Sequence, residues 1–146
     1  MDHRTEILNL LYLYQERIDQ GDVEGIGEIF SQAVLRGEDG VNSWKGAEEA
    51  AALFRGLLQL YNGSPRTTHT TLNTILEVDE EAGTAATRSV YVVYQQTDDL
   101  PLQPIVTGRY YDRFQLRDGK WEFTERVFVQ GLQGDLSRHQ TTHAAS

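Results

Sequence analysis

The hydrophobic pattern of the chain changes its period once, at the segment Asn62-Gly63-Ser64-Pro65. Before this segment apolar residues recur every three or four positions, as in amphipathic helices, and after it they alternate with polar residues, as in half-buried strands. Gly and Pro interrupt both kinds of element, so the segment marks a boundary. Helices followed by antiparallel strands predict an α+β fold, in which the helices pack on one side of a curved sheet and enclose a pocket against it.

Three helices are predicted before the boundary, because apolar side chains recur along one face of each. An Asp precedes each of the first two helices, where its carboxylate can accept hydrogen bonds from free amides of the first turn. A Gly, Gly21, suits the stop between them. The predicted helices run from an Asp2 N-cap to about residue 19, from an Asp22 N-cap to Phe30, and over about 46–61, with a loop or short edge strand at 31–46.

Four long strands are predicted after the boundary, joined by short polar turns. The Asp118-Gly119 dipeptide favours a tight hairpin before the last strand. The strand ranges are about 66–78, 84–96, 104–117 and 120–130. We expect one domain over residues 1–131 and a polar tail over 132–146, frayed beyond Arg138.

Composition narrows the classes of function. The 146 residues include 13 Lys and Arg against 22 Asp and Glu, a formal net charge of −9, which argues against nucleic acid or an anionic membrane as partner. The chain has no Cys, so thiol catalysis and thiolate metal sites are excluded. Neither a secretory signal nor 18 consecutive apolar residues is visible, so we expect a cytoplasmic protein.

Three stretches carry a family resemblance that spans residues 5–130. They are Leu10–Asp22, Pro65–His69 at the start of the first long strand, and Gly108–Phe114 with Asp118–Val127 in the last hairpin. On these residues the chain resembles the SnoaL-like branch of the nuclear transport factor 2-like superfamily. The resemblance implies a cone-like α+β barrel with a pocket. It does not fix the reaction, because the superfamily includes dehydratases, dehydrochlorinases, ketosteroid isomerases, polyketide cyclases and non-catalytic oxygenase subunits.

The resemblance also implies a catalytic pair. In the lyase members a His on this strand acts as general base and is paired with an Asp at the end of the first helix; here these are His69 and Asp19. A His suits proton abstraction near neutral pH. Asp19 lies in the last turn of its helix, where the macrodipole disfavours an acid, and Asp22 already serves as the next cap. The pair therefore lacks an obvious structural purpose.

Two further residues are candidates. Tyr14 matches a position that donates a hydrogen bond to substrate in some relatives, but it lies in the apolar stripe and filling the core explains it equally well. Arg126 matches a last-strand Arg that binds the leaving group or polarises the substrate. Strict alternation places Arg126 on one face with Glu122, Thr124 and Phe128; with the opposite register Glu125 would replace it.

Other sites have little support. The general base of the ketosteroid isomerases follows their second helix, where this chain has no acid in register, since Glu38 and Asp39 come slightly too late. His139 and His143 have i, i+4 spacing, but the surrounding Thr/Ala tail is a poor helix, so no metal site is expected. No cofactor motif is present, and we expect none to be needed.

Two functions remain open. The first is a cofactor-free lyase or isomerase, dehydratase-like or cyclase-like, acting on a hydrophobic small molecule that carries a carbonyl. The second is a non-catalytic scaffold subunit or small-molecule-binding module of the same fold. In both cases we expect a homodimer or homotrimer, because the sheets of this fold commonly associate.

Overall fold

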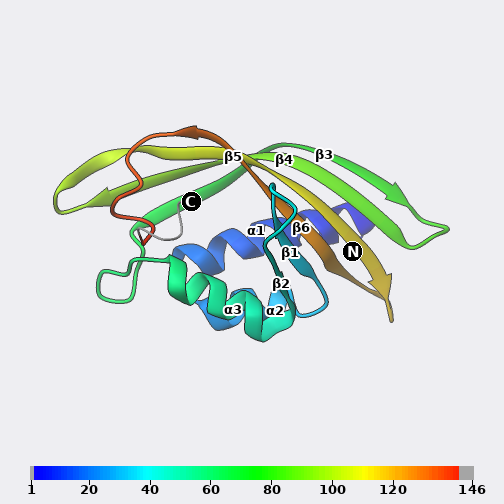
Figure 1. The fold of residues 1–146 in the computed structure, drawn as a ribbon. Helices are drawn as coiled ribbons and strands as arrows, with labels where there is room; N and C mark the ends of the chain where they lie inside the picture. Colours follow the sequence, from blue (N-terminus) through cyan, green and yellow to red (C-terminus); the bar gives the residue numbers. More distant parts are fainter. Residues whose placement is uncertain (1, 142–146) are drawn as a thin grey trace.

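Three helices cover one face of a curved sheet in the computed structural model, which describes residues 2–141 (Figure 1). Within these residues the sheet has six strands in the order β2-β1-β6-β5-β4-β3. The elements are α1 (His3–Asp19), α2 (Val23–Ile29), β1 (Val34–Gly37), β2 (Ser43–Lys45), α3 (Gly46–Leu57), β3 (Thr67–Asp79), β4 (Thr84–Thr97), β5 (Leu100–Arg117) and β6 (Lys120–Gln133). The predicted α+β class is confirmed.

The long strands form an antiparallel meander, and residues 31–46 extend it. This segment contributes two short strands, of which β1 pairs parallel with β6 and β2 pairs antiparallel with β1 at the sheet edge. The Asp118-Gly119 turn is confirmed, because both residues have positive φ values of 53° and 77°, as a tight right-twisted hairpin requires.

The helix starts follow the prediction, but one helix end does not. Asp2 accepts a hydrogen bond from the Thr5 amide at 2.8 Å, and Asp22 accepts one from the Gly25 amide at 2.9 Å. The third helix was expected to reach residue 61 and ends at Leu57 instead. Leu58 is extended and bridges to Gln140, so contact with the C-terminal part of the chain replaces the helical turn.

A β-bulge in β6 changes which side chains face the helices. Phe123 pairs with Phe114 and Glu125 pairs with Arg113, so Thr124 is an extra residue between the two pairs. Such an insertion reverses the alternation beyond it. Arg126 therefore lies on the buried face with Phe123, 0% exposed, and its expected grouping with Glu122 and Thr124 is wrong.

Residues 134–141, here called the C-terminal strap, return to the body of the molecule after β6. Gln59 donates from its side-chain amide to the carbonyls of Ser137 and Gln140, at 2.7 and 2.6 Å. His139 is only 3% exposed. The expectation of fraying beyond Arg138 is therefore wrong for 139–141, because backbone and side-chain hydrogen bonds hold them; residues 142–146 lie outside the described part.

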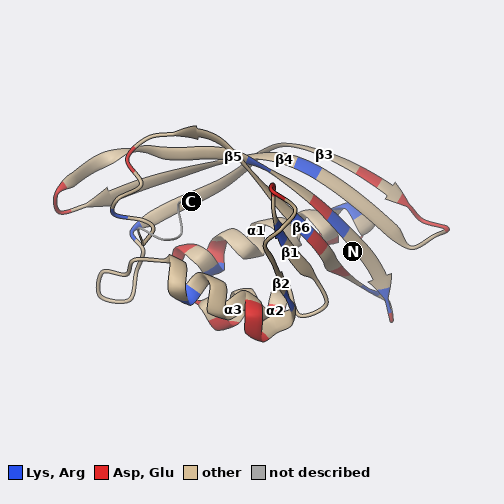
Figure 2. Ribbon diagram, viewed as in Figure 1, with Lys and Arg blue, Asp and Glu red and all other residues tan. Residues whose placement is uncertain are grey.

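The main core lies between the three helices and the sheet face that they cover. It is built largely from aromatic and branched aliphatic side chains. Acidic residues are spread over the helices, the strands and the turns (Figure 2). Among residues 2–141, no helix combines the length and apolar character needed to cross a membrane.

Candidate active site

Asp19 and His69 are hydrogen-bonded where the end of α1 meets the start of β3. Asp19 is the last residue of α1, and His69 lies on β3, on the face that packs against α1. The His69 Nδ1 lies 2.6 Å from the Asp19 Oδ1. The His69 amide and the Thr67 hydroxyl also donate to this carboxylate, at 2.8 and 2.9 Å. The helix end and the strand thus hold one carboxylate with three donors.

This geometry assigns the proton on the His69 ring. The ionised carboxylate can only accept hydrogen bonds, so His69 Nδ1 carries the hydrogen that Asp19 receives. In the neutral ring Nε2 then has its lone pair free. Since the His69 side chain is 4% exposed and lines an internal cavity, the arrangement presents a base to the inside of the molecule.

The cavity has an inner and an outer part. The inner part, about 90 Å³, is lined by His69, Tyr14, Tyr110 and His139 among others. The outer part, about 410 Å³, opens beside β1 and α3 and is lined by Trp44, Glu38 and Asp39 among others. Both parts share Phe54, Leu57, Tyr91, Phe128, Gln130 and Gln140.

Tyr14 lines the inner cavity as well as filling the core. It is 2% exposed, and its ring packs edge-on against Phe54 and Tyr110, with centroids 6.0 Å away in each case. Burial raises the pKa of the Tyr14 hydroxyl well above its usual value, more than Arg126 lowers it. Tyr14 therefore stays protonated and can donate a hydrogen bond. Both readings of this residue are compatible with its position.

Arg126 does not line either part of the cavity; it lies beneath the tyrosines. Its guanidinium makes two hydrogen bonds to Asp112, at 2.7 and 3.0 Å, and both side chains are fully buried. The guanidinium carbon lies 3.7 Å from the centre of the Tyr110 ring and 4.6 Å from that of Tyr14. Although burial alone would lower the pKa of Arg126, the Asp112 carboxylate raises it, so the guanidinium stays charged.

His139 is the site residue that the sequence interpretation missed. The centre of its ring lies 5.5 Å from that of His69, and it lines the same inner cavity. Burial, and then the neighbouring His69, lower the pKa of His139 from 6.5 to about 3, so its ring is neutral. The sequence around His139 is rich in Thr and Ala and gave no sign of a buried segment. The signal that could have found it is the i, i+3 spacing of Leu136 and His139 in an otherwise polar segment.

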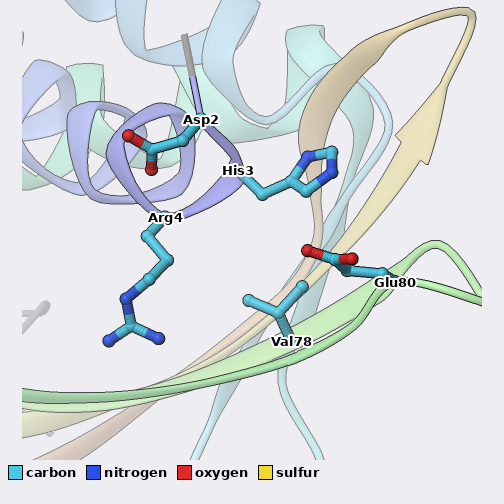
Figure 3. Close-up of a pocket in the computed structure, with 5 residues that line it drawn as sticks. All are labelled: Asp2, His3, Arg4, Val78 and Glu80. Carbon is cyan, nitrogen blue, oxygen red and sulfur yellow. The ribbon is translucent and has the colours of Figure 1, made fainter.

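Another hollow on the described surface lies away from His69. It measures about 650 Å³, where the start of α1 passes over the end of β3, and it is lined by Asp2, His3, Arg4, Val78 and Glu80 (Figure 3). Asp2 caps α1 there, and His3 accepts a hydrogen bond from the Trp121 indole at 2.9 Å. Asp2 and His3 thus have structural roles, so we place the candidate site at His69.

Within residues 2–141, no group of three or more His, Cys, Asp or Glu side chains is arranged to hold a metal ion. His143, considered together with His139 above, lies outside the described residues. Glu38 and Asp39 line only the outer cavity, and no acid from their segment lines the inner part.

Comparison with known proteins agrees with this architecture. A family model described as a SnoaL-like domain matches residues 1–127. Similar solved structures include a protein of unknown function with a cystatin-like fold from Nostoc punctiforme (24% identity, 91% of this chain and 94% of that one, TM-score 0.75). They also include a candidate scytalone dehydratase from Novosphingobium aromaticivorans (20%, 90% and 86%, 0.71) and LinA (20%, 92% and 89%, 0.71). At these identities the structures show the fold alone. No curated protein sequence matches this chain.

Proposed function

Because the chain belongs to the SnoaL-like domain family, whose fold encloses a small-molecule pocket, we propose that it is a cofactor-free lyase or isomerase acting on a hydrophobic carbonyl compound. The observation that carries the proposal is the 2.6 Å hydrogen bond between Asp19 and His69, whose ring lines the inner cavity. A carboxylate–imidazole pair with a free Nε2 is a general base whose orientation is fixed.

In the proposed reaction, His69 Nε2 takes a proton from the carbon next to the carbonyl. The C–H electron pair forms an enolate, and Asp19 stabilises the resulting imidazolium. In a dehydration, the enolate expels a hydroxide from the β-carbon as the C=C bond forms. The imidazolium then returns its proton to the hydroxide, which leaves as water. A positioned general base supplies about 10²–10⁴-fold in rate, so the abstracted proton must already be acidic.

Tyr14 is proposed to donate a hydrogen bond to a substrate oxygen, because it is protonated and lines the inner cavity. Arg126 is proposed to act through Tyr14 and Tyr110, since its charge lies under their rings and outside the cavity. The aromatic lining and the volume of the outer cavity favour a flat, largely apolar substrate.

The test uses 3-hydroxy-1-tetralone, a flat β-hydroxy ketone whose loss of water gives 1-naphthol, which is fluorescent. We expect the wild-type protein to form 1-naphthol. We expect His69→Ala and Asp19→Asn to reduce the rate by at least about 10²-fold, because the first removes the base and the second removes the charge that fixes its tautomer. His3→Ala is the matched control, since His3 lies outside the cavity and should leave the rate unchanged.

Full activity of His69→Ala would refute this mechanism. The alternative function, a non-catalytic binding or scaffold subunit, makes a different prediction. The wild-type protein would bind flat ketones in the cavity but turn over neither 3-hydroxy-1-tetralone nor other hydroxy ketones, and His69→Ala would differ from it only in affinity.

A further inference from the structure

The buried His139 has a hydrogen-bonding capacity that the surrounding protein does not use. Its Nδ1 is sealed from solvent and has no hydrogen-bond partner within the described residues. A buried polar atom left without a partner costs about 1–3 kcal/mol, so burial of an imidazole here needs a reason that packing does not supply. A leucine would fill the same place without that cost.

The C-terminal strap fixes this ring in position. The His139 carbonyl accepts a hydrogen bond from the backbone amide of Gln59 at 3.0 Å. The backbone amide of His139 donates to the Leu136 carbonyl, also at 3.0 Å. The carbonyl of the preceding Arg138 accepts from the Tyr61 hydroxyl and the Gln95 side chain, at 2.7 and 2.9 Å. The backbone that carries the imidazole is therefore held by hydrogen bonds at His139 and at the residue before it.

The two ring nitrogens of His139 differ in their surroundings, and this indicates the tautomer. A buried N–H without an acceptor is less tolerable than an acceptor without a donor. The hydrogen is therefore expected on Nε2, leaving a bare lone pair on the sealed Nδ1. Because Nδ1 is sealed and the His139 ring lines the inner cavity, Nε2 is the ring nitrogen that can face the cavity. The ring thus offers an N–H donor to whatever occupies the cavity.

The spacing of the two imidazoles fits one substrate fragment. A carbon that loses its proton to His69 must lie about 3–3.5 Å from Nε2. The oxygen of an adjacent carbonyl is two bonds from that carbon, and the His139 ring centre lies 5.5 Å from that of His69. An oxygen placed there carries the negative charge of the enolate, where a hydrogen bond from a neutral ring stabilises it.

We propose that His139 is a second catalytic residue, which donates a hydrogen bond from Nε2 to the carbonyl oxygen of the substrate while His69 removes the proton. This inference rests on the proposed function for its chemistry, but its binding component can be measured without turnover. The low pKa of His139 supports it, because the ring stays neutral beside a protonated His69.

The first experiment measures binding of two unreactive probes, 1-tetralone and tetralin, which differ only in the carbonyl. His139→Gln keeps an N–H near the position of Nε2, whereas His139→Asn is one methylene shorter and removes it. We expect Asn to weaken 1-tetralone binding by about threefold to tenfold, the range for one neutral hydrogen bond, and Gln to restore most of it. Tetralin binding should change by less than twofold in both variants.

The second experiment reads the tautomers by long-range ¹H–¹⁵N NMR of the histidine rings. We expect the Nε2–H form for His139 and the Nδ1–H form for His69, with the His139 signal shifted by 1-tetralone but not by tetralin. The inference would be overturned by an Nδ1–H form of His139 or by equal losses of affinity for both probes in His139→Asn. It would also be overturned if the wild-type protein showed no preference for 1-tetralone over tetralin.

These outcomes are separate from those of the proposed function. Selective binding of 1-tetralone through His139, without turnover of 3-hydroxy-1-tetralone, would leave the hydrogen-bond donor intact and refute the lyase. Turnover that depends on His69 but is unchanged in kcat and KM by His139→Asn would support the lyase and refute the role of His139 as hydrogen-bond donor.

Discussion

At the scale of single residues, the sequence predicted the pairing of two side chains, Asp19 and His69, and could not place two others, Arg126 and His139. The pairing of Asp19 with His69 was predictable from the family resemblance, supported by the unfavourable position of an acid in the last turn of a helix. The position of Arg126 depends on the β-bulge at the extra residue Thr124, and nothing in the local sequence predicts this bulge. The buried position of His139 depends on contacts between the strap and residues far away in the sequence, which hydrophobic periodicity cannot predict.

The buried pair of Arg126 and Asp112 leads to a stability prediction. We expect Arg126→Met to destabilise the protein by about 3–5 kcal/mol, because it leaves the Asp112 carboxylate buried without its counter-charge. The double variant Arg126→Met/Asp112→Leu should recover most of this loss, since apolar replacements of similar volume remove both charges. Urea unfolding of the single and double variants measures both effects; an equally unstable double variant would contradict the explanation.

At the scale of elements, the order of helices and strands followed from the change of hydrophobic period, while the ends of elements did not. The third helix stops at Leu57 because Leu58 pairs with Gln140, more than 80 residues later. Helix propensity acts locally and cannot anticipate such a partner. The two caps were predictable, because an Asp bonds the amides of its own turn.

The contact between α2 and α3 gives a prediction at this scale. A Cβ at Gly27 would lie 2.6 Å from the Ala47 carbonyl oxygen, whereas a Cβ at Gly56 would meet nothing within 4 Å. We expect Gly27→Ala to destabilise the protein by about 1–3 kcal/mol, as overpacking does. Gly56→Ala, the matched control in α3, should stabilise it by up to about 1 kcal/mol through helix propensity. Thermal melting distinguishes them, and similar shifts in both would show that the two helices are not packed as described.

At the scale of the whole molecule, the buried His139 couples stability to pH. In the folded protein the pKa of His139 is lowered from 6.5 to about 3, and the groups facing it include His69 and Asp19. Between these values the unfolded chain binds a proton at this residue and the folded protein does not. Stability from this group is therefore complete above about pH 6.5 and is lost as the pH falls toward 3.

The resulting prediction compares the wild-type protein with His139→Gln, which has no titrating ring. Between pH 7.5 and 5.5, the free energy of unfolding of the wild-type protein should fall by about 1.4 kcal/mol more than that of the variant. Urea unfolding at the two pH values measures the difference. Equal losses in both proteins would show that His139 takes up a proton in the folded state as readily as in the unfolded one.

The C-terminal strap has a consequence for how such a protein can acquire new specificity. The proposed general base, His69, lies within the part of the chain that matches the family model, whereas the strap begins seven residues after residue 127, where that match ends. Proton abstraction and recognition of the carbonyl would thus be encoded in separate stretches of the gene. Substitutions confined to residues 134–141 would then change which substrate is bound and leave His69 unaltered. A library for directed evolution should therefore begin with this short stretch.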